Sequence, residues 1–194
     1  MWPSRFLVTV WAVLTVSALG SSAGALLING DFSQDWTTGW ERVIKNAGST
    51  ETLVSNGKLK LHLNGLGELF MVQSVAVSSV AGLKLRASFK PQSIEHLYGI
   101  GWAGWSYVAL AYTDKDKILG FTRLLDLNCW CCDCGLLWDA QLWPKNTPTL
   151  HYIKMQDGVW TQQEISVEQE LRNYLPGIDP QKIAYVAVVL GTAG

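Results

Sequence analysis

The stretch Lys58–Leu63, KLKLHL, alternates polar residues with leucine at a period of two. This is the period of a strand that has one face buried. Leu83–Lys90, LKLRASFK, repeats the pattern and is followed by Pro91, at which we expect the strand to end. The two stretches predict a sheet with one covered face.

Short strands with similar signals recur along the chain, separated by turn residues such as Asn56-Gly57 and Asp157-Gly158. The further expected strands are Phe70–Val77, Tyr107–Thr113, Ile118–Leu125, His151–Met155, Trp160–Val167 and Ile183–Leu190. Only Glu168–Leu175 has helical spacing, and Pro176 follows it. Many short strands and one short helix predict a single all-β domain, built as a sandwich or a barrel.

The composition narrows the function classes. The chain has 194 residues, with 15 Lys and Arg against 16 Asp and Glu, for a net charge of −1. This balance argues against a nucleic-acid-binding surface, which would carry a clustered excess of basic residues. The 10 Trp residues are an unusual number for this length and indicate a role for exposed aromatic rings.

Residues 1–25 have the pattern of a secretory signal peptide. Arg5 precedes an apolar run, Phe6–Leu19, and small residues follow as far as Ala25. The run is shorter than the ~20 residues that span a bilayer. We therefore expect cleavage after Ala25, a mature domain over residues 26–194, no membrane span after cleavage, and a secreted, extracellular or periplasmic location.

All the cysteines lie in one hexapeptide, as Cys129, Cys131, Cys132 and Cys134. In an exported protein we expect these cysteines to form local disulfides and to leave no free thiols. Such disulfides would stiffen one loop. Free or intermolecular thiols and a thiolate metal cluster are the alternatives. A zinc site usually needs a second, separated pair of ligands, and the sequence has none.

The start of the mature chain resembles the galactose-binding-like jelly rolls, the β-sandwich carbohydrate-binding modules of many secreted glycoside hydrolases. The resemblance lies in Leu26–Ser33, LLINGDFS, and in Thr38–Glu41, TGWE. A second match is Gly158–Thr161, followed after a short helix by Ile178–Ile183. The resemblance implies a jelly-roll β-sandwich and a carbohydrate partner.

The resemblance also implies a structural calcium, for which Asp31 is the one carboxylate that the opening motif supplies. The alternative is that Asp31 caps its own turn. The family usually has one more strand, often ending in Asp-Asn-Val, than we find before Gly194. We therefore expect either that the chain is a fragment that lacks its closing strand or that it self-associates through an open sheet edge.

Eight tryptophans follow residue 25, and five of them lie in two long stretches without regular strand signals, residues 92–105 and 128–149. Sugars are bound by stacking aromatic rings on their apolar faces and by hydrogen bonds from polar side chains to their hydroxyls. We expect Trp40 and Trp160 to belong to the core. The expected ligand-binding residues are Trp102, Trp105, Trp138, Trp143, Tyr98, Asp139 and Gln141.

The sequence thus predicts an exported, non-catalytic carbohydrate-binding β-sandwich. A structural or adhesive surface domain that binds protein is the first alternative. A jelly-roll glycosidase or polysaccharide lyase is the second, and it would need two carboxylates facing each other across a cleft. No His-Glu-x-x-His helix or phosphate-binding glycine loop occurs in the chain.

Overall fold

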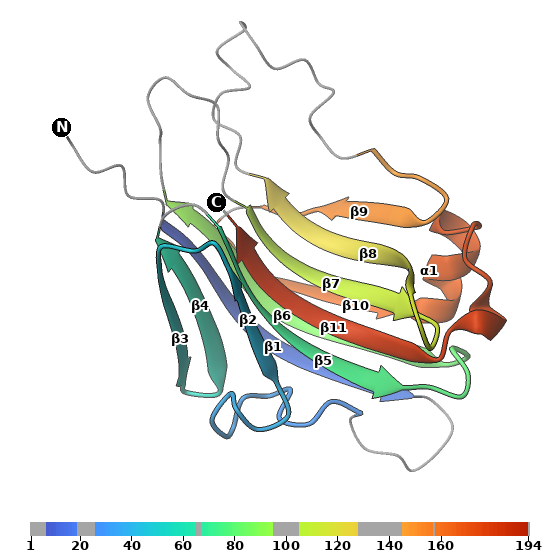
Figure 1. The fold of residues 1–194 in the computed structure, drawn as a ribbon, viewed down its shortest axis with the longest axis horizontal. Helices are drawn as coiled ribbons and strands as arrows, with labels where there is room; N and C mark the ends of the chain where they lie inside the picture. The colour runs from blue at the N-terminus through green and yellow to red at the C-terminus, as the bar shows by residue number, and fades with distance from the viewer. Residues whose placement is uncertain are drawn as a thin grey trace, which may run out of the picture.

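The computed structural model describes residues 7–18, 26–64, 67–94, 105–127, 145–156 and 158–193. Their strands form two sheets (Figure 1). The five-stranded sheet has the order β10 (Thr161–Ser166), β6 (Leu83–Ile94), β1 (Leu7–Ala18), β4 (Lys58–Asn64) and β3 (Ser49–Ser55). The six-stranded sheet has the order β2 (Glu41–Lys45), β5 (Glu68–Ala76), β11 (Tyr185–Ala193), β7 (Trp105–Thr113), β8 (Ile118–Leu127) and β9 (Leu150–Lys154).

The alternation of the strands explains why two sheets pack face to face. On β4 the buried residues are Leu59, Leu61 and Leu63, and on β7 Val108 and Leu110 alternate with residues of the other face. Because successive side chains point to opposite faces, each such strand buries one row. The rows of the two sheets meet in one hydrophobic core, so the predicted all-β sandwich is confirmed.

Strand β11 lies in the interior of the six-stranded sheet, paired antiparallel with β5 on one side and β7 on the other. Almost all of its residues are buried. This confirms that the last apolar stretch is flanked within its sheet. Self-association through an open edge stays a prediction.

The helix α1 (Val167–Tyr174) follows β10 directly and lies near the residues predicted to be helical. Its residues Val167, Glu170 and Leu171 are buried, with the spacing of one helical face. A short 3-10 helix, η3 (Pro180–Lys182), then leads towards β11, with the Asp179 carboxylate accepting a hydrogen bond from the Gln181 N–H at 3.0 Å. No described helix is long and apolar enough to cross a membrane.

The expectation that β6 ends at Pro91 is wrong, because β6 continues to Ile94. The pairing of β6 with β10 extends only to Phe89, which lies opposite Thr161, the first residue of β10. Beyond it, on the same side of β6, the Pro91 carbonyl accepts a hydrogen bond from the Gly158 N–H at 2.8 Å. The N and C=O of one strand residue point to the same side, so the missing N–H of proline costs no ladder bond there.

Three strands have no counterpart among the expected ones. Strands β2 and β3 are short and lie at the sheet edges, with largely exposed or half-buried residues. Strand β1 lies within the predicted signal peptide, between β4 and β6 (Figure 1). Removal of residues 1–25 stays a prediction.

Candidate functional site

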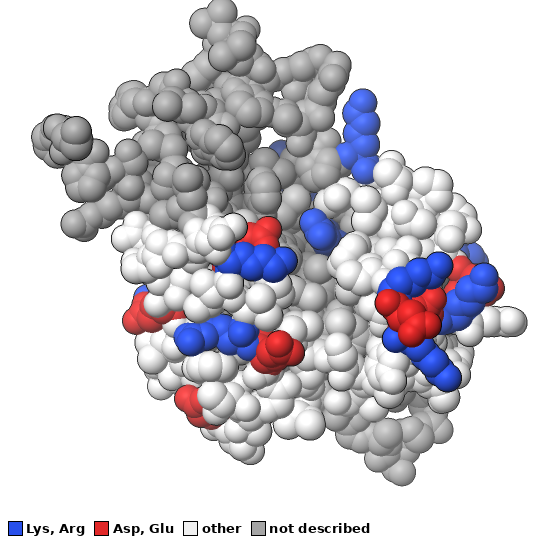
Figure 2. Space-filling model, in the orientation of Figure 1, with Lys and Arg blue, Asp and Glu red and all other residues white. Residues whose placement is uncertain are grey.

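Several small residues lie on the outer face of the six-stranded sheet, which is the face turned away from the core. On β7 the residues of this face are Tyr107, Ala109 and Ala111, and on β11 they include Ala187 and Gly191. The space-filling view shows charged side chains gathered at the left and at the right, with white surface and isolated basic side chains between them (Figure 2). Small side chains therefore line the middle of this face, where Ala109, Ala111 and Ala187 are themselves buried.

Arg123 on β8 lies among aromatic rings on this face. Its Cζ is 4.7 Å from the centroid of the Phe121 ring and 5.8 Å from that of Tyr107. These are cation–π distances. Tyr152 on β9 occupies the register position beside Arg123, so a second tyrosine belongs to the same row.

The Arg123 side chain has an unused donor. Within the described part of the chain, its Nε is buried and has no hydrogen-bond partner. A buried donor without an acceptor costs about 1–3 kcal/mol. An oxygen atom of water or of a ligand would remove that cost. We define Tyr107, Phe121, Arg123 and Tyr152 as the Arg123 cluster.

The environment of Tyr107 keeps its phenol protonated. Burial raises the pKa of Tyr107 to about 12; the negative charge of Glu68 adds to the shift, and the positive charge of Arg123 opposes it. Glu68 itself lies 3.7 Å from the Nζ of Lys45. Near neutral pH the Tyr107 hydroxyl is therefore a hydrogen-bond donor as well as an acceptor.

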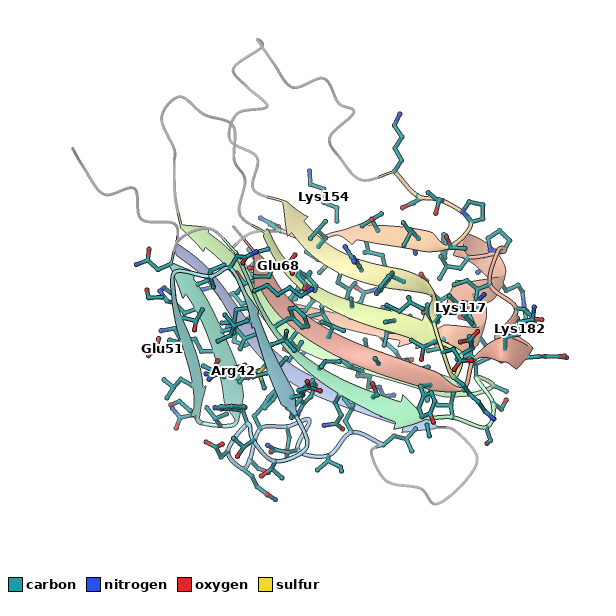
Figure 3. The ribbon with its side chains drawn as sticks, in the orientation of Figure 1. Arg42, Glu51, Glu68, Lys117, Lys154 and Lys182 are labelled. Atoms are coloured by element: carbon teal, nitrogen blue, oxygen red, sulfur yellow. The ribbon has the colours of Figure 1, made fainter. Side chains whose placement is uncertain are left out.

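Tyr107 lies near the end of the sheet where two long segments of the chain are attached, whereas Arg123 lies midway along β8. Trp105, the first residue of β7, is paired with Leu127, the last residue of β8. Segment 95–104 enters the sheet at this pair, and segment 128–144 leaves from it. Glu68 and Lys154 lie towards the same end, whereas Lys117 and Lys182 lie at the other (Figure 3).

Most of the predicted ligand-binding residues lie on these two segments, outside the described residues. They are Tyr98, Trp102, Trp138, Asp139, Gln141 and Trp143. The backbone of Trp105 is described, as the start of β7. Cys129, Cys131, Cys132 and Cys134 also lie outside the described residues, so their pairing stays a prediction.

The opening motif forms a closed turn in which Asp31 has a local partner. Its Oδ1 accepts hydrogen bonds from Ser33 N at 3.2 Å and from Ser33 Oγ at 3.0 Å. Asp31 therefore caps its own turn, which was the alternative to its expected role as a calcium ligand. No three His, Cys, Asp or Glu residues in the described ranges come together as a metal site.

The rest of the motif is held by its core residues. The Phe32 and Trp40 rings are both buried, with centroids 5.5 Å apart. This agrees with the expectation that Trp40 belongs to the core. Trp160, by contrast, is 41% exposed and lies 5.1 Å below the Nζ of Lys58, so its expected core position is wrong. It directly precedes the first residue of β10.

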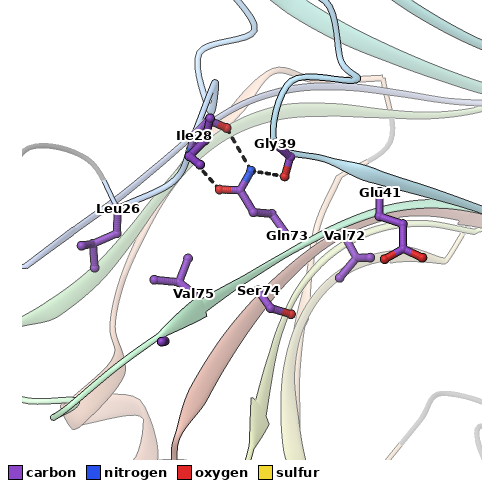
Figure 4. A pocket seen from close by; sticks show the side chains of 9 residues that line it. Leu26, Ile28, Gly39, Glu41, Val72, Gln73, Ser74 and Val75 are labelled. Carbon is purple, nitrogen blue, oxygen red and sulfur yellow. Dashed lines mark hydrogen bonds between the residues drawn. The ribbon is translucent and has the colours of Figure 1, made fainter.

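Gln73 fastens the motif to β5 (Figure 4). Its Oε1 accepts from Ile28 N at 2.7 Å, and its Nε2 donates to Ile28 O at 2.9 Å and to Gly39 O at 2.7 Å. A pocket of about 450 Å³ lies beside these bonds. The Gln73 side-chain amide thus holds Ile28 and Gly39 against β5, and we call this arrangement the Gln73 clamp. The sequence did not indicate this role, because Gln73 stands within an ordinary strand pattern.

A second groove, of about 480 Å³, lies between β9, β10 and α1. Here the Glu170 carboxylate pairs with the His151 ring and accepts a hydrogen bond from Thr122 Oγ1 at 2.9 Å. Thr122 Oγ1 lies 3.0 Å from the Tyr112 hydroxyl, which extends the chain of contacts into the core. Sequence reasoning missed this network, although Glu170 stands on the buried face of the helix beside Leu171.

The network gives the groove a structural role. Besides Glu170, the other carboxylate lining it is Glu164, which binds Lys84 at 2.6 Å and Arg86 at 2.7 Å. Both carboxylates are thus engaged by protein partners. The Arg123 cluster, with its unused donor, is the stronger candidate for ligand binding.

Comparisons of this chain with protein-family models, with curated proteins and with solved structures found no match.

Proposed function

We propose that the protein is an exported, non-catalytic β-sandwich that binds carbohydrate on the outer face of its six-stranded sheet. The observation that carries the proposal is the buried, unpartnered Nε of Arg123 between the rings of Tyr107 and Phe121. A pyranose ring presents an apolar face edged by hydroxyl groups. Aromatic rings complement the face, and a guanidinium complements the hydroxyls.

The attachment of the two tryptophan-rich segments supports the same location. Their ends meet at the Trp105–Leu127 pair, on the strands that carry Tyr107 and Arg123. We propose that Trp102, Trp138 and Trp143 supply further stacking rings for the sugar. The export of the chain is proposed from the pattern of residues 1–25.

The experiment is a glycan array probed with the purified protein, followed by calorimetry on the best glycan. Arg123→Met should weaken binding by about 10- to 100-fold, because a hydrogen bond from a charged group contributes about 1.5–3 kcal/mol. Tyr107→Ala should also weaken it. Circular dichroism should show that both variants keep the β-fold.

Trp160→Ala is the matched control, since this exposed ring belongs to the chain just before β10 in the other sheet. It should leave the affinity unchanged. If the protein binds no glycan on the array, the proposal is contradicted and the adhesive, protein-binding alternative is favoured. Full affinity in both Arg123→Met and Tyr107→Ala would show that the outer face is not the site.

A further inference from the structure

Strand β1 fills a slot between two other strands of the five-stranded sheet. It pairs antiparallel with β6 along its whole length, from Leu7 opposite Ile94 to Ala18 opposite Leu83. It also pairs antiparallel with β4, from Leu7 opposite Asn64 to Ala12 opposite Leu59. The strand runs through the interior of the sheet in Figure 1.

The even-numbered residues of β1 are of the same type as the core residues that flank them on β4 and β6. Its even-numbered residues are all apolar, VVALVA from Val8 to Ala18. Register places Val10 opposite the buried Leu61, and Leu14 opposite the buried Ala87. Residues opposite each other in an antiparallel pair share a face, so the even positions belong to the core side.

Three of the six odd-numbered positions are polar, as suits the other face. Thr9 is opposite His62, Thr15 is opposite Arg86, and Ser17 is opposite Lys84. Polar residues thus stand beside polar residues on the side away from the core. The other odd-numbered residues, Leu7, Trp11 and Val13, are apolar, so the pattern is complete on the core side only.

Removal of residues 1–25 would open the slot. The β3–β4 pair and the β6–β10 pair would face each other with unpaired backbone N–H and C=O groups. The core residues Leu61 and Phe89, which lie at the sides of the slot, would lose their neighbouring strand. Paired strand edges and an apolar floor are the features by which proteins accept an added strand.

We propose that the slot between β4 and β6 is a strand-binding site, which in the processed protein takes an extended peptide from another chain. The peptide lies antiparallel to both strands and has small or branched apolar residues at alternate positions. This inference rests on the export and cleavage in the proposed function, and it is independent of the sugar.

The test uses the whole chain, with a protease site placed within residues 19–25, which lie outside the described residues. The protein is folded first and then cut. The N-terminal fragment should stay with the domain in gel filtration. A labelled synthetic peptide with the sequence of residues 7–18 should exchange into the slot in excess, and the unlabelled peptide should compete with it.

The control peptide carries Asp in place of Val10 and Leu14, at two core-side positions, and should compete at least tenfold less well. In the whole chain, Val10→Asp should release the cut fragment, whereas Thr9→Asp, on the other face, should retain it. Equal effects of these two substitutions would overturn the assignment of faces.

The proposal is also overturned if the cut domain releases the fragment, takes up no peptide and keeps its thermal midpoint, because β4 and β6 would then pair directly. A cut domain that dimerises and excludes the peptide would likewise contradict it. Glycan binding by the same cut protein is measured separately, so that failure of the sugar proposal can be distinguished.

Discussion

The ring of Tyr107 lies directly over Gly191, its register partner on the neighbouring strand. A Cβ atom at position 191 would come within 2.2 Å of Tyr107 Cζ and 2.4 Å of its hydroxyl oxygen. Only glycine leaves room for the ring in this position. The glycine therefore leaves space for the Tyr107 ring, and the cluster together with Gly191 involves four neighbouring strands, β11, β7, β8 and β9.

Gly191→Ala should displace the Tyr107 ring. We expect a loss of about 1–3 kcal/mol in the free energy of unfolding, as for other overpacked sites, together with weaker glycan binding. Chemical denaturation and calorimetry measure the two effects. In a Tyr107→Leu background the same substitution should cost much less, and an equal cost there would show that the ring is not what Gly191 accommodates.

Alkaline pH should destabilise the fold through Tyr107. The pKa of Tyr107 is raised to about 12 by burial, whereas a tyrosine in the unfolded chain titrates near 10. Between these values the unfolded state has released a proton that the folded state retains, so the free energy of unfolding falls as the pH rises. Burial also raises the pKa of Tyr112, which adds to the fall.

Tyr107→Phe removes one of these two groups. Its free energy of unfolding should therefore decline less steeply above pH 10 than that of the wild type. Urea denaturation at a series of pH values measures the slope. An identical slope in the two proteins would contradict the burial of the Tyr107 phenol.

The Glu170 network should stabilise the contact of α1 with the sheets. Glu170→Ala leaves the Thr122 hydroxyl and the His151 ring without their shared partner, and we expect a loss of about 2–4 kcal/mol in the free energy of unfolding. Glu168→Ala is the control, because its pair with Arg172 is exposed and should contribute about 0.3–0.5 kcal/mol. Similar losses in thermal denaturation would argue against a buried network.

The Gln73 clamp should hold the opening motif on β5. Gln73→Leu leaves Ile28 and Gly39 without their side-chain partner, and we expect a loss of about 1–3 kcal/mol. Hydrogen exchange at the Ile28 amide should become faster. Gln162→Leu, an exposed position on β10, should change neither quantity. Unchanged exchange in Gln73→Leu would mean that the motif is held by its core rings alone.

The sequence predicts the strands whose apolar residues alternate clearly and misses those without that signal. Lys58–Leu63 and the apolar last strand lie in β4 and β11, because burial of one or both faces leaves a readable pattern. Strand β3 is a polar edge strand, and its composition, STETLVS, gives little indication of burial. Strand β1 is apolar at most positions, and its place after Arg5 favours a signal peptide.

The candidate site was harder to predict than the fold, because strand register creates it. Tyr107, Arg123 and Gly191 are far apart in the sequence and meet only through the pairing of β7 with β8 and β11. From sequence, a single Arg within a strand is expected to face solvent. Sugar binding by the tryptophans stays a prediction, and most of the predicted ligand-binding residues lie outside the described part of the chain.

The most direct test of sugar binding on the outer face of the six-stranded sheet follows the side chain of Arg123 during a sugar titration. Nuclear magnetic resonance of the arginine Nε–H groups, assigned by comparison with Arg123→Met, reports whether the buried donor gains an acceptor. The glycan with the highest affinity should shift the Arg123 signal and slow its exchange with solvent, with saturation at the affinity measured by calorimetry. A glycan that binds with the Arg123 signal unchanged would contradict binding on this face.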